Sequence, residues 1–251
     1  MIVDNSRDFV DKLPNFRKNL DEIMFASLPG LEQVISTHRP QAQTYIKEDG
    51  SPVTDLDLAI SRHLETIAAQ NQLGFYSEEN IGEWEFPLMI VDPIDGTKEF
   101  IAGRDEWVVS VATLYSEAIT GEGWIYNPLR KKIYSNIPKR SFVEKDFFYG
   151  EASRTEWAQG LYRENFDQFK MNPMGSIAFK LARLAAGEID FVVSLRPKNI
   201  WDIAAGTILC QQAGISFYAQ GSKVNRLKPY FAGPLIWCCE ELYPRLSKHF
   251  Y

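Results

Sequence analysis

The stretch Val91-Asp-Pro-Ile-Asp-Gly-Thr97 joins a short apolar run to a turn that carries two carboxylates. The apolar run, Leu88-Met-Ile-Val91, predicts a buried strand, and the proline after Asp92 holds that residue extended at the sheet edge. Asp95 comes three residues later, and Gly96 permits a backbone geometry that other residues resist. Two carboxylates on a tight turn can share divalent cations, and free amides at a helix start can hold a phosphate. By itself the motif fits equally well a pair of capping aspartates in an ordinary loop.

Three further acidic clusters stand in similar surroundings. They are Ser77-Glu-Glu79 after a short apolar segment, Asp49 and Asp57 on either side of residues 51–54, and Trp201-Asp202 at the start of a predicted helix. Each cluster alone fits a solvated charge or a helix cap. Four such clusters at junctions between strands, loops and helices instead indicate one shared site. Oxygen ligands without a nearby His or Cys favour Mg²⁺ over Zn²⁺.

The composition describes an ordinary globular protein with a surplus of acid. The 251 residues include 27 Lys and Arg against 33 Asp and Glu, which gives a formal charge of −6. With 45% hydrophobic and 24% charged residues, the composition excludes a disordered chain, a collagen and a coiled coil. The acid surplus argues against general nucleic-acid binding or the coating of an anionic membrane.

Cysteine content and hydropathy predict a cytoplasmic location. The three cysteines are too few and too badly spaced for a disulfide framework, and reduced thiols fit a reducing compartment. Residues 1–8 already contain charged side chains and lack the apolar core of a signal peptide. The longest uncharged run, residues 203–222, contains too many polar residues and glycines for a membrane span.

Periodicity places these clusters in a chain of helices followed by a β meander and then by alternating units. The first predicted helix carries Phe9, Leu13, Phe16, Leu20 and Ile23 and is broken or restarted at Pro14, and a second helix follows the N-cap Thr54. Strands are predicted over 107–115, 123–128 and 132–135. They are followed by a helix from Ile177 that stops at Gly187, a strand over 191–193, and a helix over 203–213 that ends at Gly214. This order suggests two layered halves with a site between them.

The motifs, taken in order, resemble the inositol monophosphatase superfamily. The resemblance rests on Asp49…Pro52-Val-Thr-x-x-Asp57, Ser77-Glu-Glu79, Asp92-Pro-Ile-Asp-Gly-Thr97, Gly175-Ser176…Lys180 and Trp201-Asp-Ile-Ala-Ala-Gly206. It implies a layered αβαβα sandwich, mixed between the α+β and α/β classes, that forms one phosphatase fold over residues 1–251. An α+β half over about 1–145 would carry the metal-binding motifs. An α/β half over about 146–251 would supply Asp202 and the substrate contacts.

The resemblance implies a site for two or three Mg²⁺ ions and sensitivity to lithium. Glu78, Asp92 and the carbonyl of Ile94 would hold one ion, and Asp92, Asp95 and Asp202 a second. Glu78 could also touch a third ion through water. The implied chemistry is in-line attack of a metal-bound water on phosphorus, without a covalent intermediate.

The resemblance also implies how the phosphate and the nucleophile are held. The amides of Gly96 and Thr97 would grip the phosphate. Asp57 would pair with the Thr97 hydroxyl to orient the nucleophile. Asp57, Glu78, Asp95 and Thr97 are therefore the expected catalytic residues.

Two details resemble the 3′(2′),5′-bisphosphate nucleotidase (CysQ-type) branch, which removes the 3′-phosphate of adenosine 3′,5′-bisphosphate. They are Lys98-Glu-Phe100 directly after Gly-Thr, and Pro197-Lys-Asn-Ile-Trp-Asp202. Inositol phosphatases place an acid seven residues before the second-motif aspartate, whereas Leu195 stands there in this chain.

Basic residues near the second motif suit a substrate with two phosphates. Arg196 and Lys198 follow Leu195, and Arg offers a bidentate grip on phosphate. Lys180, in the helix that follows Ser176, is a second candidate for the distal phosphate. All three cations fit ordinary surface charges as well.

Several alternatives stay open at this point. Residues 101–107 resemble a loop of bacterial phosphatases with several specificities, so inositol-1-phosphate and histidinol phosphate remain candidate substrates. A non-catalytic member that binds a nucleotide or a protein is disfavoured, because every carboxylate position of the mechanism is filled. The chain could be a monomer or a homodimer.

Overall fold

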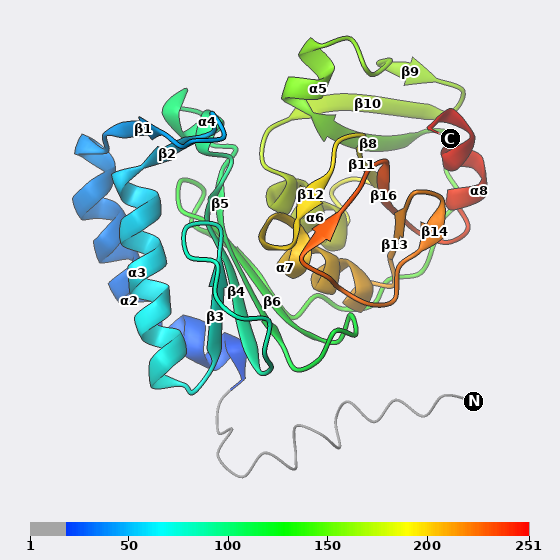
Figure 1. Ribbon diagram of the computed structural model, residues 1–251. Helices are drawn as coiled ribbons and strands as arrows, with labels where there is room; N and C mark the ends of the chain where they lie inside the picture. Colours follow the sequence, from blue (N-terminus) through cyan, green and yellow to red (C-terminus); the bar gives the residue numbers. More distant parts are fainter. Residues whose placement is uncertain (1–18, 251) are drawn as a thin grey trace.

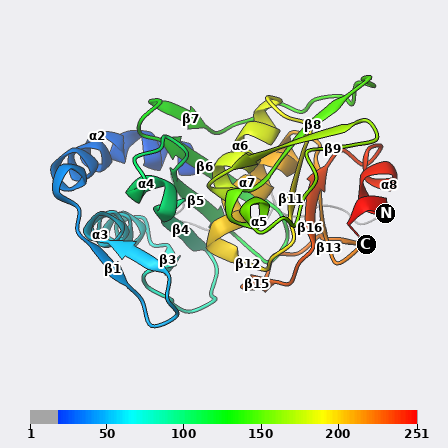
Figure 2. The same cartoon turned by 90° about the horizontal axis from the view of Figure 1, so that it is seen from above.

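The computed structural model describes residues 19–250, so the part of the predicted first helix before residue 19, with its break at Pro14, lies outside it. The described chain forms alternating helical and sheet layers, as Figures 1 and 2 show. Helices α2 (Leu20–His38) and α3 (Asp55–Gln70) lie on one side of a first sheet. Helices α6 (Ile177–Ala186) and α7 (Ile200–Gln212) lie between this sheet and a second one. Helix α8 (Tyr243–Leu246) packs on the outer face of the second sheet. The predicted αβαβα sandwich is confirmed.

The first sheet is five-stranded, and its central strands are completely buried. Its order is β3 (Gly74–Ser77), β4 (Leu88–Asp95), β5 (Val108–Leu114), β6 (Gly121–Asn127) and β7 (Lys132–Tyr134). Strand β3 is parallel to β4, and every other pairing is antiparallel. Helices cover both faces, which explains why β4 and β5 read as almost continuous apolar runs.

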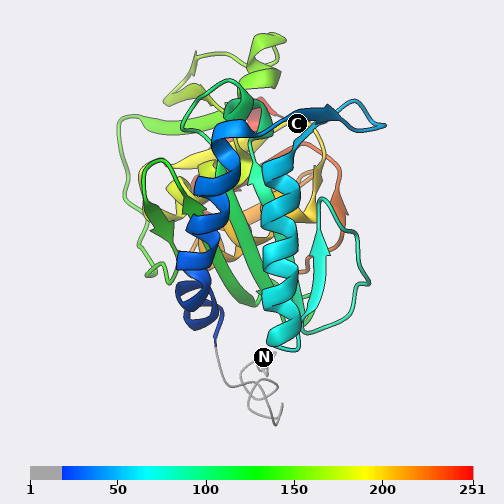
Figure 3. The same cartoon turned by 90° about the vertical axis from the view of Figure 1, so that its left-hand side faces the viewer.

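Two antiparallel helices cover the outer face of this sheet, as Figure 3 shows. Helix α2 (Leu20–His38) begins at the N-cap Asn19, whose side chain accepts from the Glu22 amide. Helix α3 (Asp55–Gln70) begins at the predicted N-cap Thr54, where a capping box pairs Thr54 with Asp57. One of the acidic clusters is therefore part of a helix start.

The second sheet is seven-stranded. Its order is β14 (Ser222–Lys223), β13 (Ser216–Ala219), β16 (Leu235–Cys238), β11 (Phe191–Ser194), β8 (Phe148–Ser153), β10 (Phe169–Met174) and β9 (Asn165–Phe166). Strands β10, β8 and β11 are parallel, and the flanking strands pair antiparallel.

The remaining helices are α6 (Ile177–Ala186) and α7 (Ile200–Gln212) of the central layer and the short helices α4 (Thr97–Ile101), α5 (Arg154–Ala158) and α8 (Tyr243–Leu246). Two small antiparallel pairs are formed by β1 (Thr44–Ile46) with β2 (Pro52–Thr54) and by β12 (Lys198–Asn199) with β15 (Tyr230–Phe231). Short 3₁₀ helices lie at Arg39–Gln41 and Ser247–His249. Apolar side chains of both sheets and of the central helices form one buried cluster. No helix within residues 19–250 is long and apolar enough to cross a membrane.

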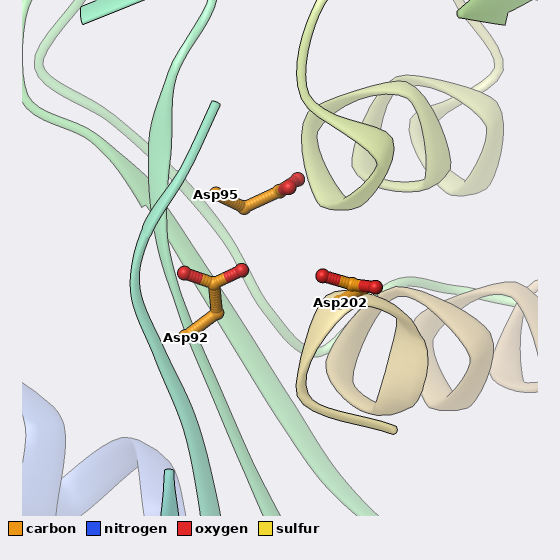
Figure 4. Close-up of side chains that lie close together, drawn as sticks. All are labelled: Asp92, Asp95 and Asp202. Atoms are coloured by element: carbon orange, nitrogen blue, oxygen red, sulfur yellow. The ribbon is translucent and has the colours of Figure 1, made fainter. Parts of the chain in front are cut away.

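Glycine allows the two central helices to approach each other closely. A Cβ atom at Gly206 of α7 would lie 2.4 Å from the Leu181 Cβ of α6. Because α6 and α7 begin at the same end of the central layer, their N-terminal turns face the end of β4 together (Figure 4). The close packing of these helices therefore positions side chains from distant parts of the chain around one point.

Candidate active site

A cavity of about 210 Å³ opens where β4 ends and where α4, α5, α6 and α7 begin. Residues of both sheets line it. Predicted site residues along its wall are Glu78, Asp92, Ile94, Asp95, Gly96, Thr97, Ser176, Lys180, Lys198 and Asp202. This position, where strand ends meet helix starts between layers, is common for ligand sites in layered folds.

Three of the carboxylates form a cluster in this cavity. Asp92, Asp95 and Asp202 each offer an oxygen atom, and these atoms all lie within 4.8 Å of one another. Figure 4 shows Asp92 and Asp95 reaching from β4 toward Asp202 at the start of α7. The pairing of β4 with β5 shifts between Asp92 and Asp95, which places both aspartates on the same side of the strand end.

Hydrogen bonds from the two central helices hold the cluster. One carboxylate oxygen of Asp95 accepts from the Ser176 hydroxyl at 2.5 Å and from the Ala178 amide at 2.5 Å. Asp202 accepts from the Asn199 amide at 3.0 Å, within the capping box of α7. In Asp95 and in Asp202 these hydrogen bonds occupy one carboxylate oxygen, so the other oxygen of each side chain can bind a ligand.

The cluster concentrates negative charge in a buried place. Burial and the charges of Glu78, Asp95 and Asp202 raise the pKa of Asp92 well above its usual range. Burial, with the charges of Asp95 and Glu78, raises the pKa of Asp202 to about 7 against the opposing charge of Lys198. The buried Oδ1 of Asp92 has no hydrogen-bond partner in residues 19–250. An orphaned carboxylate oxygen among like charges fits a divalent cation, which would satisfy the oxygen and remove the repulsion.

Glu78 also lines the cavity, and it makes an ion pair that the sequence did not predict. The Lys47 ammonium lies 2.9 Å from the Glu78 carboxylate and 2.7 Å from that of Glu79. Burial lowers the pKa of Lys47, but the hydrogen bonds and charges of the two glutamates outweigh it and raise the value to about 12. Lys47 follows β1, so this short hairpin is tied to the acidic end of the cavity.

Thr97 and Asp57 meet beside the cluster. The Thr97 hydroxyl lies 3.1 Å from the Ile94 carbonyl and 3.5 Å from Asp57 Oδ1. The other oxygen of Asp57 accepts from the Thr54 amide at 2.8 Å and from its hydroxyl at 2.5 Å. Burial raises the pKa of Asp57 to about 7.

Gly96 makes the turn between β4 and α4 possible. Its φ is 100°, and a Cβ atom there would lie 2.8 Å from the Glu106 carbonyl oxygen. A side chain is therefore excluded by conformation and by space.

The predicted basic residues are placed differently from one another. Lys180 is 2% exposed, and its ammonium donates to the carbonyls of Met174 at 3.0 Å and Gly175 at 3.1 Å. Burial lowers the pKa of Lys180 to about 8. Lys198 lines the cavity, whereas Arg196 is not among the lining residues and donates to Gln159 Oε1 at 2.6 Å.

The structure adds residues to the cavity wall that sequence reasoning missed. Lys98 and Glu99 of α4 line it, as do Ser153, Arg154 and Thr155 at the junction of β8 and α5. Strand β8 carries no catalytic motif, and only the folded chain brings Arg154 to Glu106, 48 residues earlier. The sequence offered no local signal for this contact.

Comparison with known proteins agrees with this architecture. The sequence model of the inositol monophosphatase family matches residues 18–146 and 141–236. The 3′(2′),5′-bisphosphate nucleotidase CysQ of Buchnera aphidicola is 27% identical over a region that covers 82% of this chain and 87% of the relative.

Two solved structures share the fold. Staphylococcal inositol monophosphatase-1, in a LiCl-soaked inhibitory complex, has a TM-score of 0.76 and 18% identity, over 91% of this chain and 93% of that one. An IMPase/NADP phosphatase in complex with Mg²⁺ and phosphate has a TM-score of 0.73 and 18% identity, over 91% and 94%. The family match spans most of the chain, and its motifs form the acidic cavity. The chain therefore belongs to the inositol monophosphatase family.

Proposed function

We propose that this protein is a Mg²⁺-dependent, lithium-sensitive phosphomonoesterase that removes the 3′-phosphate of adenosine 3′,5′-bisphosphate and releases AMP. The observation that carries the proposal is the cluster of Asp92, Asp95 and Asp202 within 4.8 Å, beside the Gly96 turn. The resemblance of residues 98–100 and 197–202 to the bisphosphate nucleotidases, and the CysQ relative, support the choice of substrate.

The residues of the cavity suit two or three Mg²⁺ ions. Glu78, Asp92 and the Ile94 carbonyl would hold one ion, and Asp92 would share a second with Asp95 and Asp202. When bound, the cations would neutralise the phosphoryl oxygens and lower the pKa of a coordinated water. The orphaned oxygen of Asp92 supports this assignment.

The chain itself would position the phosphate and the attacking water. The amides of Gly96 and Thr97 lie at the start of α4, where backbone donors would suit a phosphoryl group. Asp57, next to the Thr97 hydroxyl, would orient the water for attack in line with the ester bond. The water oxygen would then bond to phosphorus while the bond from phosphorus to O3′ breaks, and one proton of the water would pass to the leaving oxygen.

We also propose that the protein works in the cytoplasm on a small phosphorylated substrate. Free thiols suit a reducing compartment, and Cys210, Cys238 and Cys239 form no disulfide. Two of these cysteines are buried, where they act as small apolar residues.

The proposed substrate is tested by phosphate release in Mg²⁺ from adenosine 3′,5′-bisphosphate and from inositol-1-phosphate, each with and without lithium. We expect kcat/KM to favour the nucleotide by about tenfold or more, since a second phosphate adds charge-assisted contacts. Lithium should suppress the release. Preference for inositol-1-phosphate would contradict the nucleotide assignment while keeping the phosphatase class. Release from neither ester would make histidinol phosphate the next substrate to test.

A further inference from the structure

We propose that Arg154 binds the phosphate of the substrate that is not hydrolysed, and that it sets the preference for a bisphosphate over a monophosphate. This inference rests on the proposed function and adds the group that recognises the second anionic end of the substrate. Arg154 was not among the residues that the sequence indicated. It lines the cavity from the start of α5, in the second sheet's layer.

Glu106 holds the Arg154 side chain at the wall of the cavity that Gly96 also lines. Its Nη2 lies 2.6 Å from both carboxylate oxygens of Glu106, and the Gly175 amide donates to the same carboxylate at 2.8 Å. The Glu106 carbonyl packs against Gly96, where a Cβ atom would lie 2.8 Å away. Glu106 therefore contacts the Gly96 turn through its backbone and holds the guanidinium through its carboxylate, and Arg154 and Gly96 line the same cavity.

Arg154 keeps donors to spare in this position. A guanidinium has five N–H donors in a planar fork, and the bonds to Glu106 use only Nη2. Its buried Nε has no hydrogen-bond partner in the described chain, and the side chain makes no hydrogen bond or ion pair there other than those of Nη2 with Glu106, so the two donors of Nη1 are unused. About a third of the side chain is exposed, on the wall of the cavity. A charged fork with unused donors at the edge of an anion site suits a phosphate.

The other cations near the cavity are less suited to this role. The Lys180 ammonium is buried and already donates to two carbonyls, so it supports the wall of the cavity. Lys198 acts on the carboxylate cluster, where its charge opposes the raised pKa values of Asp95 and Asp202. Arg196 lies outside the cavity lining and bonds to Gln159. Lys98 is the remaining competitor, because it is exposed on α4 and lines the cavity.

The test compares two substrates that share the reacting phosphate. Adenosine 3′,5′-bisphosphate carries the second phosphate, and adenosine 3′-monophosphate lacks it. In Arg154→Gln we expect kcat/KM for the bisphosphate to fall about tenfold or more, mainly through KM, while the value for the monophosphate stays within about twofold. Arg154→Lys should recover part of the loss because it keeps the charge without the fork. Arg245→Gln is the matched control, because Arg245 also pairs with a glutamate, Glu144, and lies outside the cavity lining; it should change kcat/KM for neither substrate.

Product inhibition gives an independent measurement. The product 5′-AMP carries the second phosphate and lacks the reacting one, so its inhibition constant should rise about tenfold in Arg154→Gln. Equal losses on both substrates would show that Arg154 only supports Glu106, and would overturn the inference. A selective loss in Lys98→Gln with none in Arg154→Gln would overturn it as well.

The same measurements separate this inference from the proposed function. A wild-type enzyme that prefers the bisphosphate, with a preference that survives Arg154→Gln, contradicts only the role of Arg154. A wild-type enzyme that treats both nucleotides alike contradicts the proposed bisphosphate specificity, and with it the inference.

Discussion

At the scale of single residues, Asp95 joins the first sheet to the central helix layer through its hydrogen bonds. It extends from β4, yet its partners Ser176 and Ala178 belong to the start of α6. The motif around residue 95 predicted its position at a turn, but it could not reveal these partners, which lie more than 80 residues later in the chain. The bonds fix the carboxylate of Asp95, which offers an oxygen within 4.8 Å of oxygens of Asp92 and Asp202.

We predict that Asp95→Asn lowers kcat by at least about 10³-fold, because a ligand lost from a preorganised charged site removes several kcal/mol of transition-state stabilisation. The fold should survive, since the amide oxygen can still accept from Ser176 and Ala178. Steady-state kinetics with a parallel thermal melt test this. A variant that keeps half of the wild-type activity would exclude Asp95 from the metal site.

Lys180 gives the folded protein a definite pH dependence. Burial lowers its pKa from 10.5 to about 8. Between these pH values the unfolded chain holds the proton and the folded chain does not, so the contribution of Lys180 to stability rises with pH across this window. At lower pH that contribution is lost, because the buried ammonium is then charged.

Lys180→Met removes this titration. The stability of the wild type relative to the variant should therefore increase between pH 8 and 10.5, whatever its sign at pH 7. Thermal melts of both proteins over a pH series measure the difference. A difference that stays constant with pH would show that Lys180 titrates at its ordinary value.

The carboxylates of the site could be predicted from the sequence, because each follows a strand or opens a helix within a recognisable motif. The Lys47 and Arg154 contacts could not be predicted in this way. Lys47 pairs with Glu78, 31 residues later, and Arg154 pairs with Glu106 across 48 residues. Such pairs depend on the packing of separate elements, which local sequence does not encode.

At the scale of elements, the packing of α6 against α7 sets the distance between Ser176 and Asp202. We predict that Gly206→Ala destabilises the protein by about 1–3 kcal/mol, since the new methyl group would meet the Leu181 Cβ at 2.4 Å. Activity should fall as well, because the two helix starts would move apart. Chemical denaturation and steady-state kinetics measure both effects.

Gly30→Ala is the matched control, because Gly30 also lies inside a helix, α2. A Cβ atom there would meet only the His63 ring, with its nearest atom at 3.0 Å, and this side chain can move. The control should change stability by no more than about 1 kcal/mol, since alanine is the better helix former. Equal destabilisation by both substitutions would argue against a special role for the contact between α6 and α7.

Elements with clear caps or clear periodicity could be predicted from the sequence. Elements that contain a proline could not, because proline normally marks the end of a helix or strand. The N-cap Thr54 and the terminal Gly187 marked α3 and α6 correctly. Helix α2 continues through Pro29 to His38, beyond the range that the apolar spacing indicated. Strand β10 contains Pro173, which is tolerated because β9 pairs only with residues 169 and 170 and leaves that edge free.

At the scale of the whole molecule, the layers bring together acids that are far apart in the chain. Asp92 and Asp202 stand on opposite sides of the cavity, one at the end of the first sheet and the other on the central helix layer. The resemblance to the inositol monophosphatase superfamily implied this arrangement of layers, and the structure confirms it. The strand pairings of the second sheet could not be predicted from the sequence. Strands β8 and β10 are parallel and are joined by a long connection over residues 154–168.

We propose that this acidic cavity hydrolyses a nucleotide bisphosphate with the help of Mg²⁺. The most direct test is to free the protein of metal with a chelator, supply adenosine 3′,5′-bisphosphate, and follow phosphate and nucleotide products while Mg²⁺ is added back. We predict that phosphate and 5′-AMP form only after Mg²⁺ is added, and that Asp95→Asn forms neither at a comparable rate. Release of phosphate at an undiminished rate without any divalent cation would contradict the proposed Mg²⁺ dependence. Formation of 3′-AMP in place of 5′-AMP would contradict the proposed removal of the 3′-phosphate.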